Sequence, residues 1–150
     1  TFTGLSTLSM ALGLPDDGSL IALDKNIETN SKAQSFFKKA YQDKKIQTIV
    51  KPALETLEEF KNDNLIFDII FIDADKDNYI NYYDKVMQMA KPSGLIIIDN
   101  VLWHGEVADE ENNKKFTKII RDFNTYVKND KRTEQIILPL GDGLTICSKL

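Results

Sequence analysis

The sequence predicts an α/β fold in which a mostly parallel sheet is covered by helices on both faces. Short apolar runs bounded by turn-forming residues alternate with segments in which apolar residues recur at helical spacing, a pattern typical of parallel strands joined by helices. Three runs are also continuously apolar, as expected of strands buried on both faces. These runs cover residues 20–23, 69–72 and 95–98, and we expect them to be central strands.

The pattern places strands over residues 20–24, 47–50, 67–73 and 95–99, with two further strands near the end of the chain. The last two strands are separated by the turn-forming stretch LGDG at residues 140–143, which predicts a β-hairpin. One antiparallel strand added to an otherwise parallel sheet is a common arrangement. We therefore expect a mixed sheet whose only antiparallel strand belongs to this hairpin.

Four segments show the i, i+3, i+4 recurrence of apolar residues that predicts amphipathic helices. The first is expected to begin at a cap within residues 29–31, and the third to stop before Pro92 and Gly94. We interpret the aromatic and Met side chains of these stripes as core. The stripes are Ala33, Phe36, Phe37, Ala40 and Tyr41; Leu54, Leu57 and Phe60; Tyr79, Ile80, Tyr83, Met87 and Ala90; and Phe116, Ile119, Ile120, Phe123 and Val127.

Size and charge exclude several classes of protein. With 150 residues and 42% hydrophobic content, the chain suits one domain. A net charge of -4 without a basic stripe argues against nucleic-acid binding. The longest apolar runs are about five residues, whereas a membrane-spanning helix needs about 20. We expect a soluble protein that binds neither nucleic acid nor membrane.

Cys147 is the single cysteine, so the chain cannot form an internal disulfide. This fits a reducing compartment, and we expect a cytoplasmic protein. The alternating polarity around Cys147 indicates a strand, which favours an inert buried thiol over a nucleophile.

Each of the three continuously apolar runs is followed by an aspartate: Asp24, Asp73 and Asp99. An acid in this position lies at the carboxyl edge of the sheet, where open α/β folds bind their ligands. Any one of them could instead cap a loop, although three together make that explanation weaker.

Asp24 and the first loop have the features of a nucleotide-type cofactor site. A carboxylate at a strand end can accept hydrogen bonds from both ribose hydroxyls of an adenosine-containing cofactor, and it serves NAD and S-adenosylmethionine equally. Ahead of it, Gly4 would let the backbone approach a ligand at the N-terminus of a helix. A simple helix cap by Thr3 is the alternative.

Asp73, Asp99 and Asn100 follow strands that should be neighbours, so their oxygens can converge. Two carboxylates and an amide carbonyl are hard ligands suited to Mg²⁺, Mn²⁺ or Ca²⁺, and without a cation two converging carboxylates would repel each other. The alternative is two separate loop aspartates. One Cys and one His do not make a competing zinc site.

Lys76 comes just after this proposed metal site. A divalent cation beside a lysine disfavours the ammonium form, so Lys76 could accept a proton from a metal-bound hydroxyl. The alternative is a surface lysine paired with Asp75 or Asp77.

Five motifs of this chain resemble, in order and at similar spacing, those of the caffeoyl-CoA O-methyltransferase-like family, which is related to the catechol O-methyltransferases. The resemblance covers essentially the whole chain, and the paired DADK and DNVLW motifs are specific to it. The motifs are TFTGLS at residues 1–6, PALETL at 52–57, FIDADK at 71–76, DNVLW at 99–103 and GDGLT at 141–145.

The resemblance implies the Rossmann-like sheet of S-adenosylmethionine (SAM)-dependent methyltransferases, mostly parallel with a C-terminal antiparallel hairpin strand. It implies transfer of a methyl group from SAM to a hydroxyl of a vicinal diol, with a divalent cation, preferably Mg²⁺, as cofactor. The acceptor would be a small phenolic molecule, and a homodimer is expected. Acyl-CoA phenolics, free catechols and flavonoid-like diols all remain open as acceptors.

The resemblance also implies a role for each matching residue. Lys76 matches the general base of the related catechol enzymes, and Trp103 matches an aromatic wall of the acceptor pocket. The metal ligands would be Asp73, Asp99 and Asn100, and the cofactor contacts Thr1, Ser6, Asp24, Ala53 and Asp75.

Two departures from the family pattern are visible. The family has an acidic residue and a glycine on a first strand just before Thr1, preceded by N-terminal helices, and this sequence contains none of them. We therefore expect residues 1–150 to form a single methyltransferase domain that is incomplete at its N-terminus. His104 replaces the Asn or Gly of other members; it could contact the acceptor, but a solvent-facing side chain is the preferred interpretation.

Two other functions remain as alternatives. The first is an NAD-dependent Rossmann oxidoreductase, whose G-x-G-x-x-G fingerprint does not occur in this sequence. The second is a SAM-binding module without turnover, which the intact metal ligands and Lys76 argue against.

Overall fold

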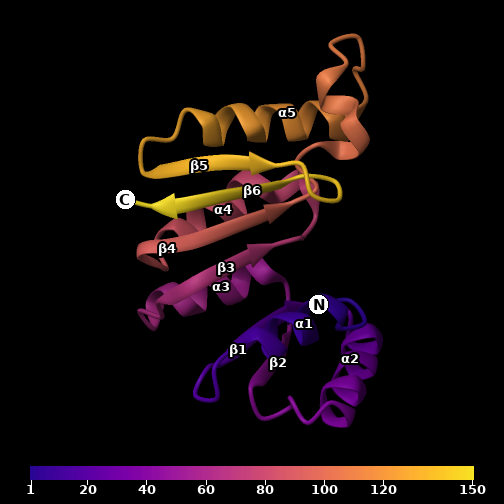
Figure 1. The fold of residues 1–150 in the computed structure, drawn as a ribbon, viewed down its shortest axis with the longest axis vertical. Helices are drawn as coiled ribbons and strands as arrows, with labels where there is room; N and C mark the ends of the chain where they lie inside the picture. Colours follow the sequence, from indigo (N-terminus) through magenta and orange to yellow (C-terminus); the bar gives the residue numbers. More distant parts are fainter. The chain divides into compact units, whose positions relative to one another are not determined.

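The computed structural model describes residues 1–150 and divides them into two compact units, Thr1–Leu57 and Glu58–Leu150. Each unit combines strands with helices, so the predicted α/β class is confirmed. The order of the elements along the chain can be followed by colour in Figure 1. None of the helices is long and apolar enough to span a membrane.

The first unit contains two parallel strands, and helices alternate with these strands along the chain. Strand β1 pairs with β2 from Leu20↔Ile46 to Asp24↔Val50. The core of the first unit consists of Ala11, Ala33, Phe37 and Ile46, with Leu8 and Leu20 packed against them. The elements are α1 (Leu5–Gly13), β1 (Leu20–Asp24), α2 (Ile27–Lys39), β2 (Ile46–Val50) and the start of α3 (Ala53–Asn62).

Helix α2 begins earlier than predicted. Its cap is Asn26, whose side chain accepts hydrogen bonds from the backbone amides of Glu28 and Thr29, so the predicted cap within residues 29–31 is wrong. The apolar stripe of this helix is also only partly core. Ala33 and Phe37 are buried, whereas Phe36 is 49% exposed and Tyr41 is 89% exposed, because Tyr41 lies beyond the helix in a left-handed conformation.

The second unit is built on a four-stranded mixed sheet. The strand order is β3-β4-β6-β5, with β3 parallel to β4 and with β6 antiparallel to both of its neighbours (Figure 1). The predicted C-terminal hairpin and its single antiparallel strand are therefore confirmed. The elements are β3 (Phe67–Ile72), η1 (Lys76–Asn78), α4 (Tyr79–Met87), β4 (Ala90–Asp99), η2 (Trp103–Ala108), α5 (Lys115–Lys128), β5 (Thr133–Leu138) and β6 (Leu144–Lys149).

Of the three strands predicted to be central, only β4 has a partner on each side. Strand β1 pairs with β2 alone and β3 with β4 alone, and Ile69 of β3 is 57% exposed. A continuous apolar run predicts burial of both faces of a strand, and the exposure of Ile69 contradicts that expectation for part of β3. The run also carries no information about the edges of a strand. The run alone therefore did not determine the number of paired neighbours.

Strand β4 begins before Pro92, where the sequence predicted the end of a helix. Ala90 was expected on the third helical stripe, but it pairs with Phe67 of β3. An irregularity in register lies between Phe67 and Ile69, and Ser93 has a φ of 61°. This kink accommodates Pro92 within a strand, so the prediction for Ala90 was wrong.

Aromatic side chains of α4 and α5 form the core beside the sheet. The rings of Tyr79 and Tyr83 meet the ring of Phe123 edge-on, with centroid distances of 5.3 Å and 6.1 Å. All three residues are buried. Edge-to-face pairs add about 0.5–1.5 kcal/mol each beyond the burial of their surface, so this cluster fixes the start of α4 firmly.

Cys147 lies on β6 and is fully buried. Burial raises the pKa of its thiol to about 11. The thiolate is the reactive form of cysteine, so the prediction of an inert, buried thiol is confirmed.

Candidate active site at the ends of β3 and β4

The predicted metal ligands lie at the carboxyl ends of neighbouring strands in the sheet of the second unit. Strands β3 and β4 are parallel neighbours, with Ile72 opposite Ile98. Asp73 follows the last residue of β3, and Asp99 is the last residue of β4. The expectation that these strand ends are adjacent is therefore confirmed.

Lys76 joins the two strand ends. Its Nζ donates hydrogen bonds to Asp73 Oδ1 at 3.2 Å, to Asn100 Oδ1 at 2.8 Å and to the hydroxyl of Tyr79. The Lys76 side chain is only 11% exposed. Asp77, by contrast, pairs with Lys115 at 2.7 Å. Lys76 is thus the centre of a polar cluster, and the alternative of a surface lysine is not supported.

The turn after β4 holds Asn100 in an unusual backbone conformation. Asn100 has a φ of 60°, in the left-handed region that Asn tolerates better than most residues. Its backbone amide donates to Asp99 Oδ1 at 2.7 Å. The backbone carbonyl of Asp99 accepts a hydrogen bond from Tyr79 at 3.0 Å. The structure thus brings Asp73, Lys76 and Asn100 together, and the Asp99 carboxylate bonds within its own turn.

The hairpin between β5 and β6 supports this turn. The backbone amides of Val101 and Leu102 donate to the carbonyls of Gly143 and Asp142 at 3.1 Å and 2.9 Å. The Asp142 carboxylate accepts from the backbone amide of His104. The sequence indicated a hairpin turn at residues 140–143 and a family motif at 141–145; in the structure, Asp142 and Gly143 also hold the loop after β4.

Negative charge accumulates around the hydroxyl of Tyr79. Burial raises the pKa of Tyr79 well above its usual value, and the charges of Asp73, Asp99, Asp75 and Asp142 raise it further, in that order. The cluster around Lys76 is accordingly suited to positive charge.

The donor set at this site fits a divalent cation. The Asp73 carboxylate and the Asn100 amide oxygen both accept hydrogen bonds from the Lys76 ammonium, so the two oxygens converge on one positive charge. Oxygens of this kind are the ligands that Mg²⁺ prefers. The structure has no group of three or more His, Cys, Asp and Glu side chains that could hold a metal. The proposed set has two carboxylates, so the Asn100 amide oxygen would be its third protein ligand.

Asp75 has structural partners of its own. Its carboxylate accepts hydrogen bonds from the Tyr82 hydroxyl at 2.7 Å and from the Asn78 side chain at 2.5 Å. These bonds tie the segment after β3 to α4. The contact with a cofactor remains a prediction for Asp75.

Trp103 and His104 begin η2, both with positive φ. The Trp103 ring lies 5.6 Å from the ring of His104 and 5.7 Å from that of Phe116, so it is held from two sides. The His104 side chain is 76% exposed, in agreement with the solvent-facing interpretation. The contact of Trp103 with an acceptor remains a prediction.

In the first unit, Asp24 is the last residue of β1 and its carboxylate bonds the neighbouring backbone. Its two carboxylate oxygens accept hydrogen bonds from the backbone amides of Phe2 at 2.7 Å and Asn26 at 2.9 Å. Burial acts to raise the pKa of Asp24, but the hydrogen bonds from the backbone amides of Asn26 and Phe2 lower it, and the pKa lies below its usual value. A carboxylate has about four acceptor positions, so Asp24 retains capacity for a ligand.

Gly4 is required by packing as well as by backbone conformation. It is the N-cap of α1, with a φ of 94° and without a side-chain cap, so the alternative in which Thr3 caps the helix is wrong. A Cβ at this position would lie 2.7 Å from Phe37 Cε1 and 2.8 Å from Ala33 Cβ. The tight approach of the loop to α2 therefore explains this glycine.

The remaining predicted cofactor residues lie at element starts. The Thr1 hydroxyl donates to the carbonyl of Leu23 at 3.0 Å. Ser6 is exposed in the first turn of α1, and Ala53 is the first residue of α3. Their contacts with a cofactor remain predictions.

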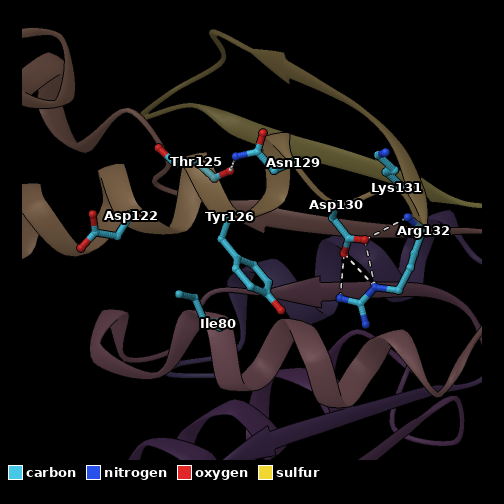
Figure 2. Close-up of a pocket in the computed structure, with 8 residues that line it drawn as sticks. All are labelled: Ile80, Asp122, Thr125, Tyr126, Asn129, Asp130, Lys131 and Arg132. Carbon is cyan, nitrogen blue, oxygen red and sulfur yellow. Dashed lines mark hydrogen bonds and ion pairs between the residues drawn. The ribbon is translucent and has the colours of Figure 1, made fainter.

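A groove of about 590 Å³ lies between α4 and the C-terminal end of α5 (Figure 2). None of its lining residues is a predicted site residue. Its Arg132 pairs with Asp130 of the lining at 2.7 Å and with Asp84 outside it at 2.8 Å. The groove is therefore not part of the candidate site.

Replacing Gly143 by alanine is expected to destabilise the anchored loop. Gly143 has a φ of 84°, and a Cβ there would overlap Leu102 Cγ. Gly141 is the matched control, because its φ is also positive at 57° and its Cβ would meet nothing within 4 Å. We expect Gly141→Ala to lower the free energy of unfolding by about 1–2 kcal/mol. Gly143→Ala should lower it by about 1–3 kcal/mol more, as measured by urea unfolding. Equal losses for the two variants would contradict the packing argument.

Comparison with known proteins identifies the family of the chain. The model of a family described as O-methyltransferase matches residues 1–150. A caffeoyl-CoA O-methyltransferase from Petroselinum crispum is 40% identical over 158 residues, which cover 99% of this chain and 66% of that protein. Caffeoyl-CoA O-methyltransferase 2 from Zea mays is 39% identical over 158 residues, covering 99% of this chain and 60% of that protein.

Solved structures show the same fold. The O-methyltransferase from Bacillus cereus, in complex with SAH, has a TM-score of 0.89 and 29% sequence identity, over 99% of this chain and 71% of that chain. The chain spans 60% to 66% of the length of the curated relatives described above.

Proposed function

Because the chain belongs to the O-methyltransferase family, we propose that the protein transfers a methyl group from SAM to one hydroxyl of a catechol-type vicinal diol, and that the reaction requires a divalent cation. The observation that carries this proposal is the cluster around Lys76, which holds one positive charge between Asp73 and Asn100 at the carboxyl edge of the sheet. The names of the relatives and the SAH of the Bacillus cereus structure support the reaction class.

Asp73, Asp99 and Asn100 would hold the cation, with Mg²⁺ preferred and Mn²⁺ or Ca²⁺ as alternatives. When bound, the cation supplies a Lewis acid that makes a diol hydroxyl more acidic. The two aspartates would contribute charged carboxylate oxygens to the cation, and Asn100 would contribute a neutral amide oxygen. The Asn100 amide oxygen already accepts a hydrogen bond from Lys76 at 2.8 Å, so it faces the cluster that would hold the cation.

Lys76, as the neutral amine, would receive the proton of the reacting hydroxyl at Nζ. Its side chain is largely shielded from water and is positioned by three acceptors. As the proton leaves, the hydroxyl oxygen forms a bond to the methyl carbon of SAM and the bond from that carbon to sulfur breaks. The products are the methyl ether and S-adenosylhomocysteine. Because opposite charges are neutralised in this step, positioning supplies much of the rate.

Thr1, Ser6, Asp24 and Ala53 of the first unit would bind the cofactor. The low pKa of Asp24 keeps its carboxylate ionised, which suits hydrogen bonds from ribose hydroxyls. In the second unit, Asp75 would be a further cofactor-side residue, and Trp103 would line the acceptor pocket. Trp103 is held by its neighbours, which favours a fixed aromatic wall.

The proposal is tested by methyl transfer to catechol in the presence of Mg²⁺, with 1,2-dimethoxybenzene as the acceptor control. We expect a monomethyl ether from catechol, loss of the reaction with EDTA, and recovery on addition of excess Mg²⁺. Full activity in EDTA would contradict the metal requirement. If the protein binds SAH by isothermal titration but methylates no diol, the protein is a binding module. Failure to bind either SAM or SAH would overturn the proposal.

A further inference from the structure

We propose that Tyr79 is a positioning residue for Lys76, and that its buried hydroxyl fixes the lysine against the turn that carries Asp99 and Asn100. This inference rests on the function proposed above, since it concerns the same site. The interpretation of the sequence assigned Tyr79 only to the core stripe of a helix.

The hydrogen bonds of Tyr79 connect two parts of the site. Its hydroxyl accepts from Lys76 Nζ and donates to the backbone carbonyl of Asp99 at 3.0 Å. A lysine ammonium can only donate, so the hydroxyl proton is free to bond the carbonyl. The hydroxyl thus links the catalytic side chain to the strand end that carries two of the proposed metal ligands.

The ring of Tyr79 is held in place independently of these bonds. Tyr79 is 1% exposed and begins α4, and its ring packs edge-on against Phe123 at 5.3 Å. The Nζ of Lys76 also lies 4.5 Å from the centroid of this ring. A fixed partner is useful here because a lysine side chain has about 2 kcal/mol of rotamer entropy to lose.

Tyr79 differs from the other two acceptors of Lys76. Asp73 and Asn100 are assigned to the metal, so a cation and the lysine ammonium compete for the same two oxygens. The Tyr79 hydroxyl is the third acceptor and has no part in the proposed metal set. It therefore supplies the contact that Lys76 keeps when the other two oxygens are engaged. Without this contact, Lys76 would depend on the metal ligands alone.

The test compares Tyr79→Phe with Tyr83→Phe. Tyr83 lies on the same helix, is 0% exposed and packs edge-on against the same Phe123, but its hydroxyl pairs with Thr133 Oγ1 at 3.3 Å. Each variant loses one buried hydroxyl and keeps its ring. We expect Tyr79→Phe to lower kcat by about 10-fold to 100-fold, as is typical for a residue that orients a site, with the KM for SAM unchanged. Tyr83→Phe should change neither.

Mn²⁺ binding, measured by isothermal titration, gives a readout that does not need turnover. We expect Tyr79→Phe to bind Mn²⁺ several-fold more weakly, because Lys76 then relies on Asp73 and Asn100 and competes more strongly with the ion. Tyr83→Phe should bind Mn²⁺ as the unaltered protein does. Urea unfolding of both variants measures the purely structural loss, which should be similar in the two.

A double-mutant cycle decides whether Tyr79 acts through Lys76. In a Lys76→Met background, Tyr79→Phe should have no further effect on kcat or on Mn²⁺ affinity. Unchanged kcat and Mn²⁺ affinity in Tyr79→Phe, or the same losses in the Lys76→Met background, would overturn the inference. If the unaltered protein shows no methyl transfer, the proposed function fails, while the Mn²⁺ affinities of the four proteins still decide the role of Tyr79.

Discussion

Lys76→Met will lower kcat for catechol methylation by about 100-fold to 10,000-fold, the range expected when a general base is removed. Methionine retains the length and the apolar stem of lysine and removes only the group that accepts the proton. The Lys76 side chain is 11% exposed and Nζ bonds Asp73 and Asn100, so water has little access to replace it. Single-turnover kinetics with saturating SAM would isolate the chemical step.

Lys115→Met is the matched control for this prediction. Lys115 pairs with Asp77, which follows Lys76 in the chain, at 2.7 Å, but the Lys115 side chain is 68% exposed. We expect this variant to keep full activity. SAH affinity should be unchanged in both variants. If Lys76→Met retained full kcat, the base would have to be another group, and the proposed role of Lys76 would be wrong.

Asp73→Asn will weaken Mn²⁺ binding by at least about 100-fold, since loss of an orienting partner outside the ligand set already costs 10-fold to 100-fold. The substitution keeps the shape of the side chain and removes its charge. Metal-stimulated methyl transfer should fall in parallel, because fewer molecules carry the ion at a given concentration. Isothermal titration with Mn²⁺ measures the affinity directly.

Asp77→Asn provides the control for Asp73→Asn. The two aspartates lie four positions apart, each pairs with a lysine, and each side chain is 47% exposed. Their general effect on surface charge is therefore the same, and only Asp73 bonds the cluster around Lys76. Equal losses of Mn²⁺ affinity in the two variants would show that the effect is long-range electrostatics rather than ligation.

The sequence predicted the strands of the fold well because short apolar runs bounded by turn-forming residues are typical of strands. The range predicted from residue 20 to residue 24 is the observed β1, and the hairpin was located from its turn residues. The start of α2 was missed because several residues near it can cap a helix, and local hydrogen bonding selected Asn26. The start of β4 was missed because Pro92 normally ends regular structure, whereas pairing of Ala90 with Phe67 extends the strand beyond it.

The candidate site was predictable to the extent that it depends on strand ends. Asp73, Lys76 and Asn100 were located from their positions after apolar runs and from the family motifs, and the structure joins them through one ammonium. Tyr79 was missed because helical periodicity accounts for its ring and says nothing about its hydroxyl. Asp142 was missed because its contact with the loop after β4 joins residues 38 positions apart.

The most direct test of the proposed metal site is an anomalous difference map from crystals of the protein grown with Mn²⁺ and SAH. We expect a Mn²⁺ peak bound by the side-chain oxygens of Asp73, Asp99 and Asn100, with Lys76 Nζ withdrawn from Asp73 and Asn100 and still bonded to Tyr79. A peak elsewhere, or an unchanged Lys76 between Asp73 and Asn100 at saturating Mn²⁺, would contradict it.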